Sequence, residues 1–219
     1  MIMKKAQVSR RSQIERTAET QSVLIQAAVR LLATAGYGKT TTQSIAKEAG
    51  VTTGALHHHF PTKDDLMLAV LDQSAITVEA KLEAENAMPF TGKASIRDVV
   101  DHLWQIYGQP DYWAVWEIII GTRVDAGVHQ RVLEHRAQSM ANVMLPWLKR
   151  VDSLTGSVTR SDAAEIFEFM LITIRGLSLE RFMDKDPAYF ERHLSMLADF
   201  VSFRLQSLEQ QLAHQETKL

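Results

Sequence analysis

The sequence predicts an all-α protein, and three observations indicate this class. Gly and Pro are sparse, at ten and five of 219 residues. Apolar residues recur at steps of three and four, and no segment shows the alternation of a strand. The segments between the Gly and Pro positions are rich in the strong helix formers Ala, Leu, Glu, Gln, Arg and Met. We expect about nine helices, with three at the N-terminus forming a small unit ahead of a longer helical body.

The first helix is predicted for residues 17–35. Leu24, Ala28 and Leu32 form an apolar stripe along it, and Gly36 follows as a C-terminal stop. Residues 1–16 precede this helix and carry Lys4-Lys5 and Arg10-Arg11. We expect these residues to form a basic, flexible arm that adds nonspecific affinity for a polyanion or has no role.

Two short helices follow, at about residues 42–49 and 53–60. Thr41 or Thr42 can cap the first, and Thr52 can cap the second. In the second, Leu56 and Phe60 lie one helical turn apart and face inward, and the proline after Phe60 forbids continuation. The linker Gly50-Val51-Thr52 between them completes a helix-turn-helix pattern.

Longer helices make up the rest of the chain. Thr62 caps the fourth, with Asp65 placed to complete a capping box. Pro146 is expected to kink or end the helix around it. The last two helices are predicted at about residues 161–182 and 187–211. Other breaks are expected near Met88-Pro89, Gly108-Gln109-Pro110, Gly121 to Gly127, Ser153 to Thr159 and Asp184 to Pro187.

The charges are unevenly distributed along the chain. Residues 1–65 hold nine Lys/Arg against five Asp/Glu, and the remainder holds 15 against 21, within a formal net charge of −2. A basic front on an acidic body suggests that only the front meets a polyanion, although a solvated basic tail explains the charges equally well.

Three consecutive histidines, His57, His58 and His59, stand out in the second short helix. Neighbouring helical residues point about 100° apart, so these imidazoles cannot converge on one ion. Helical metal pairs need a spacing of three or four residues, and no second ligand stands at that spacing. We therefore predict no metal site and expect the histidines to meet phosphates or bases, with His58 or His59 alternatively packing against the first helix.

Residues 31–72 resemble the DNA-binding domain of the TetR family of transcriptional regulators. The matching features are Gly36-Tyr37, Thr41-Thr42, Ile45-Ala46, Ala49-Gly50-Val51, Gly54-Ala55-Leu56, His58-His59-Phe60 and Lys63-Asp64-Asp65-Leu66. His57 stands where the family commonly has tyrosine, and Thr53 where a longer side chain is common. The resemblance implies a helix-turn-helix DNA-binding domain at residues 17–65. A helical regulatory and dimerisation domain is implied at residues 66–219.

The resemblance and the polar outer face of the second short helix together predict the residues that meet DNA. Lys63 lies in the first turn of a helix, where a cation opposes the helix dipole but can bind a phosphate. The predicted contacts are Thr42, Gln43, Thr52, Thr53, Gly54, Ala55, His57, His58, His59 and Lys63.

A helix-turn-helix protein usually binds DNA as a dimer, because two reading helices then meet successive major grooves. Apolar stripes in the last two predicted helices can form a four-helix bundle between two chains or the core of one chain. The predicted homodimer interface comprises Ile166, Phe167, Met170, Ile174, Leu177, Phe190, Leu194, Leu197, Val201, Leu205 and Leu208.

An aromatic-rich stretch in the body suggests a pocket for a small apolar or aromatic ligand, although ordinary core packing explains each residue alone. The implied function is a repressor that binds a palindromic operator and is released by such a ligand. A regulator without an inducer, or an activator, is the alternative. The predicted pocket residues are His102, Trp104, Tyr107, Tyr112, Trp113, Trp116, Glu117, Arg123 and Trp147.

Two other classes of protein fit the sequence less well. An all-α enzyme would need a catalytic group of residues, but the sequence has no cysteine and no G-x-S-x-G, H-E-x-x-H or phosphate-binding glycine loop. A helical adaptor would leave the basic front unexplained. We predict no catalytic residues and no cofactor. Without an apolar run of membrane length or a secretory signal, a cytoplasmic location is expected.

Overall fold

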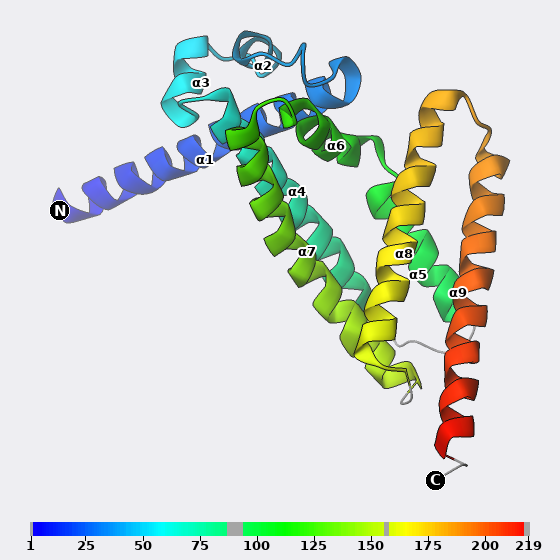
Figure 1. Ribbon diagram of the computed structural model, residues 1–219. Coiled ribbons are helices and arrows are strands. Elements are labelled where there is room, and N and C mark those ends of the chain that lie inside the picture. Colours follow the sequence, from blue (N-terminus) through cyan, green and yellow to red (C-terminus); the bar gives the residue numbers. More distant parts are fainter. Residues whose placement is uncertain (1, 87–93, 156–157, 217–219) are drawn as a thin grey trace. The chain divides into compact units, whose positions relative to one another are not determined.

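The computed structural model describes residues 2–86, 94–155 and 158–216 and confirms the all-α class (Figure 1). No strand occurs within these ranges, and none of their helices is long and apolar enough to cross a membrane. The helices are α1 Ile2–Ala35, α2 Thr42–Glu48, α3 Thr53–His59, α4 Lys63–Asn86, α5 Ala94–Tyr107, α6 Pro110–Thr122, α7 Ala126–Thr155, α8 Arg160–Leu179, the 3-10 helix η1 Glu180–Met183, and α9 Pro187–Glu216.

The helix ends agree with the sequence prediction at most of the described breaks, and one expectation was wrong. The arm predicted at residues 1–16 is helical from Ile2 onward and continues into α1 without a break. Of the two outcomes expected at Pro146, a kink or an end, the end does not occur, because α7 extends to Thr155. The break predicted near Met88-Pro89 lies outside the described residues.

The chain forms two compact units whose limits differ from the domain division predicted at residue 65. The first comprises Met1–Ile76 and Trp113–Ala137, and the second comprises Thr77–Tyr112 and Gln138–Leu219. Helices α4, α6 and α7 each contribute to both units. The unit that carries the helix-turn-helix therefore also contains most of α6 and the first part of α7.

The core of the first unit follows the predicted apolar stripes. Leu24, Ala28 and Leu32 of α1 are fully buried, as are Ile45 of α2 and Leu56 of α3. These side chains bring the three helices together, and contacts join each of the three pairs. A burial of this completeness contributes about 1.5–3 kcal/mol for each large aliphatic side chain.

In the second unit, a core of α5, α8 and α9 uses the very residues that were predicted for the dimer interface. All eleven of them except Phe190, which is half-buried, are at most 8% exposed within a single chain. A side chain already enclosed by its own chain has little surface left to give to a partner, so these residues act first as core, and their place in a dimer interface stays a prediction. The apolar period of α8 and α9 had correctly marked a packed face, but the face is intramolecular.

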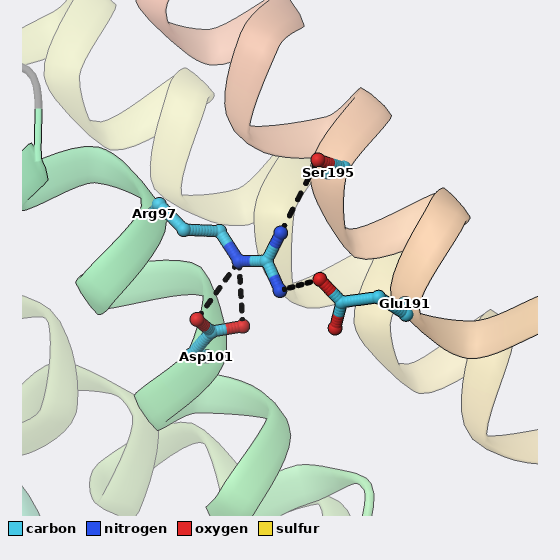
Figure 2. Close-up of polar contacts among 4 residues, drawn as sticks. All are labelled: Arg97, Asp101, Glu191 and Ser195. Carbon is cyan, nitrogen blue, oxygen red and sulfur yellow. Dashed lines mark hydrogen bonds and ion pairs between the residues drawn. The ribbon is translucent and has the colours of Figure 1, made fainter. Parts of the chain in front are cut away.

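Polar and aromatic contacts fix α5 against α9 at the edge of this core. Figure 2 shows Arg97 of α5 donating to Asp101 on its own helix and to Glu191 and Ser195 on α9. The hydrogen bonds to Asp101, and then to Glu191, raise the pKa of the Arg97 guanidinium above its ordinary value. Nearby, the rings of Trp104 and Phe190 stack with centroids 5.3 Å apart.

Candidate nucleic-acid interface

The turn between α2 and α3 is built from caps and one glycine. Thr41 caps α2 and forms a capping box with Ser44, and Thr52 caps α3 by accepting a hydrogen bond from Ala55 N at 3.1 Å. Gly50 has φ +70°, a left-handed conformation that other residues adopt at a cost of roughly 1–2 kcal/mol. These groups set the direction in which α3 leaves the turn.

Helix α3 has a buried inner face and an accessible outer face. Leu56 is fully buried and Phe60, which caps the helix, is 7% exposed. All ten residues predicted to contact DNA, from Thr42 to Lys63, are exposed or half-buried, and none is buried. Their contact with DNA remains a prediction, but each has surface with which to make it.

The three histidines differ in exposure and in contacts. In the described part of the chain, no group of three or more His, Cys, Asp or Glu side chains lies close enough to hold one metal ion. His57 is exposed, and its Nδ1 lies 3.1 Å from the carbonyl oxygen of Pro61, to which the Nδ1–H donates. That bond leaves Nε2 as an acceptor in the neutral ring and a donor in the protonated ring. His58 is exposed, His59 is half-buried, and their rings meet edge to face at 5.4 Å.

The turn after α1, which begins with Gly36 and Tyr37, is held by helix α6 of the same unit. The backbone N–H of Tyr37 donates to Oε2 of Glu117 at 2.8 Å, while Oε1 of Glu117 accepts from Trp113 Nε1 at 3.1 Å. Both carboxylate oxygens are therefore engaged. Glu117 was predicted as a ligand contact, and the structure instead gives it a role in fixing the DNA-reading unit.

The ring of Tyr37 is enclosed from two further sides. On one side, a Cβ built on Gly121 of α6 would lie 2.2 Å from Cγ of Tyr37, so only glycine fits there. On the other side, Nζ of Lys63 lies 3.7 Å from the ring centroid and donates to the Tyr37 carbonyl at 2.9 Å. Burial lowers the pKa of Lys63 and raises the pKa of Tyr37. Lys63 thus has an intramolecular role beside its predicted phosphate contact.

The residues predicted for the ligand pocket are divided between the two units. Glu117, Trp113 and Arg123 belong to the first unit, where Arg123 is exposed and donates to the carbonyl of Ile120. In the second unit, Tyr107 and Tyr112 are buried against each other with ring centroids 4.8 Å apart. The others are Trp116 in the first unit, His102 and Trp104 in the second, and Trp147, whose side chain lies outside the described residues.

Sequence reasoning missed the role of Gly121 and of the Tyr37 turn. The visible signal was a glycine that α6 retains near its end, because a helical glycine often marks a close approach. The partner of that glycine is 84 positions away in the chain, so no local pattern could identify it.

The buried inner face, the short polar α3 and the glycine turn together define a helix-turn-helix protein that binds DNA. Residues 24–70 match the model of a family described as "Bacterial regulatory proteins, tetR family". This segment is therefore similar to the DNA-binding domain of that family, and the chain is a DNA-binding transcriptional regulator.

One similar protein covers most of the chain, and another covers less than half of it. The transcriptional regulator CymR of Pseudomonas putida is 28% identical over 183 residues, which is 84% of this chain and 89% of CymR. The regulator AcrR of Shigella flexneri is 33% identical over 86 residues, 39% of this chain and 40% of AcrR.

Solved structures show the same fold. A transcriptional regulator from Rhodococcus sp. Rha1 aligns with a TM-score of 0.68 at 19% identity, over 86% of this chain and 97% of that one. A regulator from Saccharomonospora viridis, solved with choline, aligns with a TM-score of 0.65 at 20% identity, over 84% and 96%.

Proposed function

We propose that the protein is a repressor that binds a palindromic operator as a homodimer and is released by a small-molecule ligand. It acts by binding and not by catalysis. A seated dimer would block transcription without any further contact. The symmetry of the dimer would be matched by the symmetry of the operator, with half-sites about one helical turn apart.

The observation that carries the dimer is an exposed apolar face on α8 and α9, opposite to the residues that form the core. Phe169 and Ile172 of α8 are 43% and 68% exposed, and Phe203 of α9 is 70% exposed. Single exposed apolar residues are ordinary, but a contiguous stripe on two adjacent helices is typical of an interface. The stripe comprises Phe169, Ile172, Leu179, Met196, Phe200 and Phe203.

The same face has a shape that favours a second copy of the chain. The rings of Phe169 and Phe200 lie 5.1 Å apart and line a hollow of about 170 Å³. Asp162, Glu165 and Arg204 also line it, so the face combines apolar side chains with charges of both signs. Such a face is self-complementary under a two-fold axis, because its acids can meet the partner's arginine.

Release by a ligand would follow from coupling between the body and the DNA-reading unit. Helix α4 begins at Lys63 and supplies residues to both compact units, which makes it the natural lever. A ligand that favours a different spacing of the two reading helices would weaken operator binding by about 1–3 kcal/mol of coupling. In support, the structurally similar Saccharomonospora protein was solved with a small molecule.

Phe203→Glu tests the assembly. We expect it to place a charge within the apolar stripe, to give monomers in sedimentation velocity and to weaken operator binding. The matched control is Val124→Glu, which puts the same charge on an apolar side chain that is 86% exposed outside the stripe. If Phe203→Glu remains dimeric, or if Val124→Glu dissociates equally, the stripe is not the interface.

A further inference from the structure

Arg175 of α8 is half-buried, and two of its three guanidinium nitrogens have no hydrogen-bond acceptor. Its Nε and Nη2 atoms are buried and make no hydrogen bond. A guanidinium group does not lose its proton in proteins, so this charge cannot be removed by titration. Burying a charge is costly unless it is paired, and most proteins pair it.

Arg97, in the same unit, shows what a completed arginine site looks like. It uses the same two nitrogens, with Nε donating to Asp101 and Nη2 donating to Glu191 at 2.6 Å (Figure 2). Arg175 presents the equivalent edge with no acceptor. Nε–H and one Nη2–H point in parallel from this edge, which matches the two oxygens of one carboxylate.

The surroundings of Arg175 are apolar and aromatic. Its Cζ lies 5.2 Å from the ring centroid of Tyr107 on α5, and Tyr107 is 2% exposed. Leu171 and Ile174, within one turn of Arg175 on α8, are also buried. A group that satisfies the guanidinium here would place the rest of its own surface among apolar side chains.

We propose that Arg175 binds the carboxylate of a small ligand with an apolar body. This inference rests on the proposed function, because it names the class of molecule that the regulatory body takes up. One negative charge balances the one guanidinium, and the Nε–Nη2 edge holds the carboxylate in a fixed orientation. A cation such as the choline found in the Saccharomonospora protein would be repelled here, so the shared fold does not fix the ligand class.

The test measures binding to the full-length protein without DNA. The probes are benzoate, phenylacetate and octanoate, each compared with its primary amide, and the readout is the concentration dependence of Tm. At least one acid is expected to raise Tm while its amide does not. Arg175→Met should weaken that acid at least tenfold, Arg175→Lys should weaken it less, and Arg192→Met, at an exposed arginine of α9, should leave it unchanged.

The ligand-free variant gives an independent readout. Because Arg175→Met replaces an unpaired charge with an apolar side chain of similar length, its Tm should equal or exceed that of the unaltered protein. The proposal is overturned if no acid acts differently from its amide, if Arg175→Met responds like the unaltered protein, or if Arg175→Met melts well below it.

These results separate the inference from the proposed function. A protein that binds an acid through Arg175 but keeps its hold on the operator contradicts ligand release and supports the carboxylate site. A protein that binds a palindrome as a dimer but ignores every acid contradicts the carboxylate site alone.

Discussion

The Tyr37 turn and the outer face of α3 lie in the same compact unit but differ in their contacts: the turn is held by contacts within the chain, whereas the outer face of α3 is exposed. Tyr37 is bonded through its backbone to Glu117 and Lys63, and its ring fits against Gly121. The outer face of α3 leaves Gly54, His57 and His58 exposed. Internal contacts therefore position the reading helix, while its outer face is left for DNA. Changes at the turn should alter stability, and changes at the face should alter recognition.

Gly121→Ala should give the largest effect on stability. The added Cβ would lie 2.2 Å from Cγ of Tyr37, so the ring or α6 must shift, at a cost of about 1–3 kcal/mol. In a chain of this length the expected loss is about 2–4 °C in Tm for each kcal/mol.

Gly54→Ala is the matched control, since its Cβ would meet nothing closer than Thr52 Oγ1 at 3.9 Å. It should keep or raise Tm, because alanine favours the helix. Equal Tm values for the two variants would show that α6 can accommodate a Cβ at position 121 against the Tyr37 ring without loss of stability.

Glu117→Leu should destabilise the protein by a smaller amount. It leaves the part-buried N–H of Tyr37 without its acceptor, which costs about 1–3 kcal/mol in unfolding free energy, reduced by any water that reaches the group. Glu117→Gln keeps one acceptor oxygen for the Tyr37 N–H but turns its NH2 donor towards Trp113 Nε1, so it should recover part of this loss in urea denaturation. A glutamine variant as unstable as the leucine variant would mean that the hydrogen bond is not the source of the effect.

Lys63→Met should change stability least, and it separates the two roles of this side chain. If Lys63 also contacts phosphate, operator affinity falls for all sequences. The slope of log K against log salt then becomes shallower by about 0.9. Fluorescence anisotropy between 50 and 200 mM salt, roughly the range over which such slopes are resolved, measures it. An unchanged slope would mean that Lys63 contacts the Tyr37 turn and no phosphate.

The pH dependence of the same variant tests the burial of Lys63. Burial lowers the pKa of Lys63 below its model-peptide value of 10.5, so the unfolded chain binds more protons in the window just below that pH. The free energy of unfolding of the unaltered protein, relative to that of Lys63→Met, should therefore rise as pH increases through the folded-state pKa of Lys63. Tyr37 titrates in both proteins, so its contribution largely cancels in the difference between them. A difference that falls with pH would show that Lys63 is better solvated than its position indicates.

Local sequence signals were sufficient for the DNA-reading helices. Thr41, Thr52, Gly50 and Pro61 act on their immediate neighbours, so the limits of α2 and α3 could be predicted to within a residue or two. Leu56 and Phe60 were correctly placed inward because their spacing fixes one helical face. The family resemblance covers this same segment, and the match over residues 24–70 confirms it.

Properties that depend on distant parts of the chain could not be predicted. An apolar stripe on α8 does not say whether the chain itself or a second copy covers it, and the structure shows that the chain itself already covers Phe167 and Met170, which were predicted for a dimer interface. The roles of Glu117 and Arg175 depend on Tyr37 and on missing acceptors, respectively, and neither is visible from neighbouring residues.

Selection of bound DNA from a random double-stranded pool tests the central claim most directly. The account predicts that the protein enriches a palindrome whose half-sites lie about one helical turn apart. It also predicts that Thr53→Ala and His57→Ala melt like the unaltered protein but enrich a different half-site. Enrichment of no sequence, or of the same palindrome by both variants, would contradict the conclusion that the outer face of α3 reads DNA.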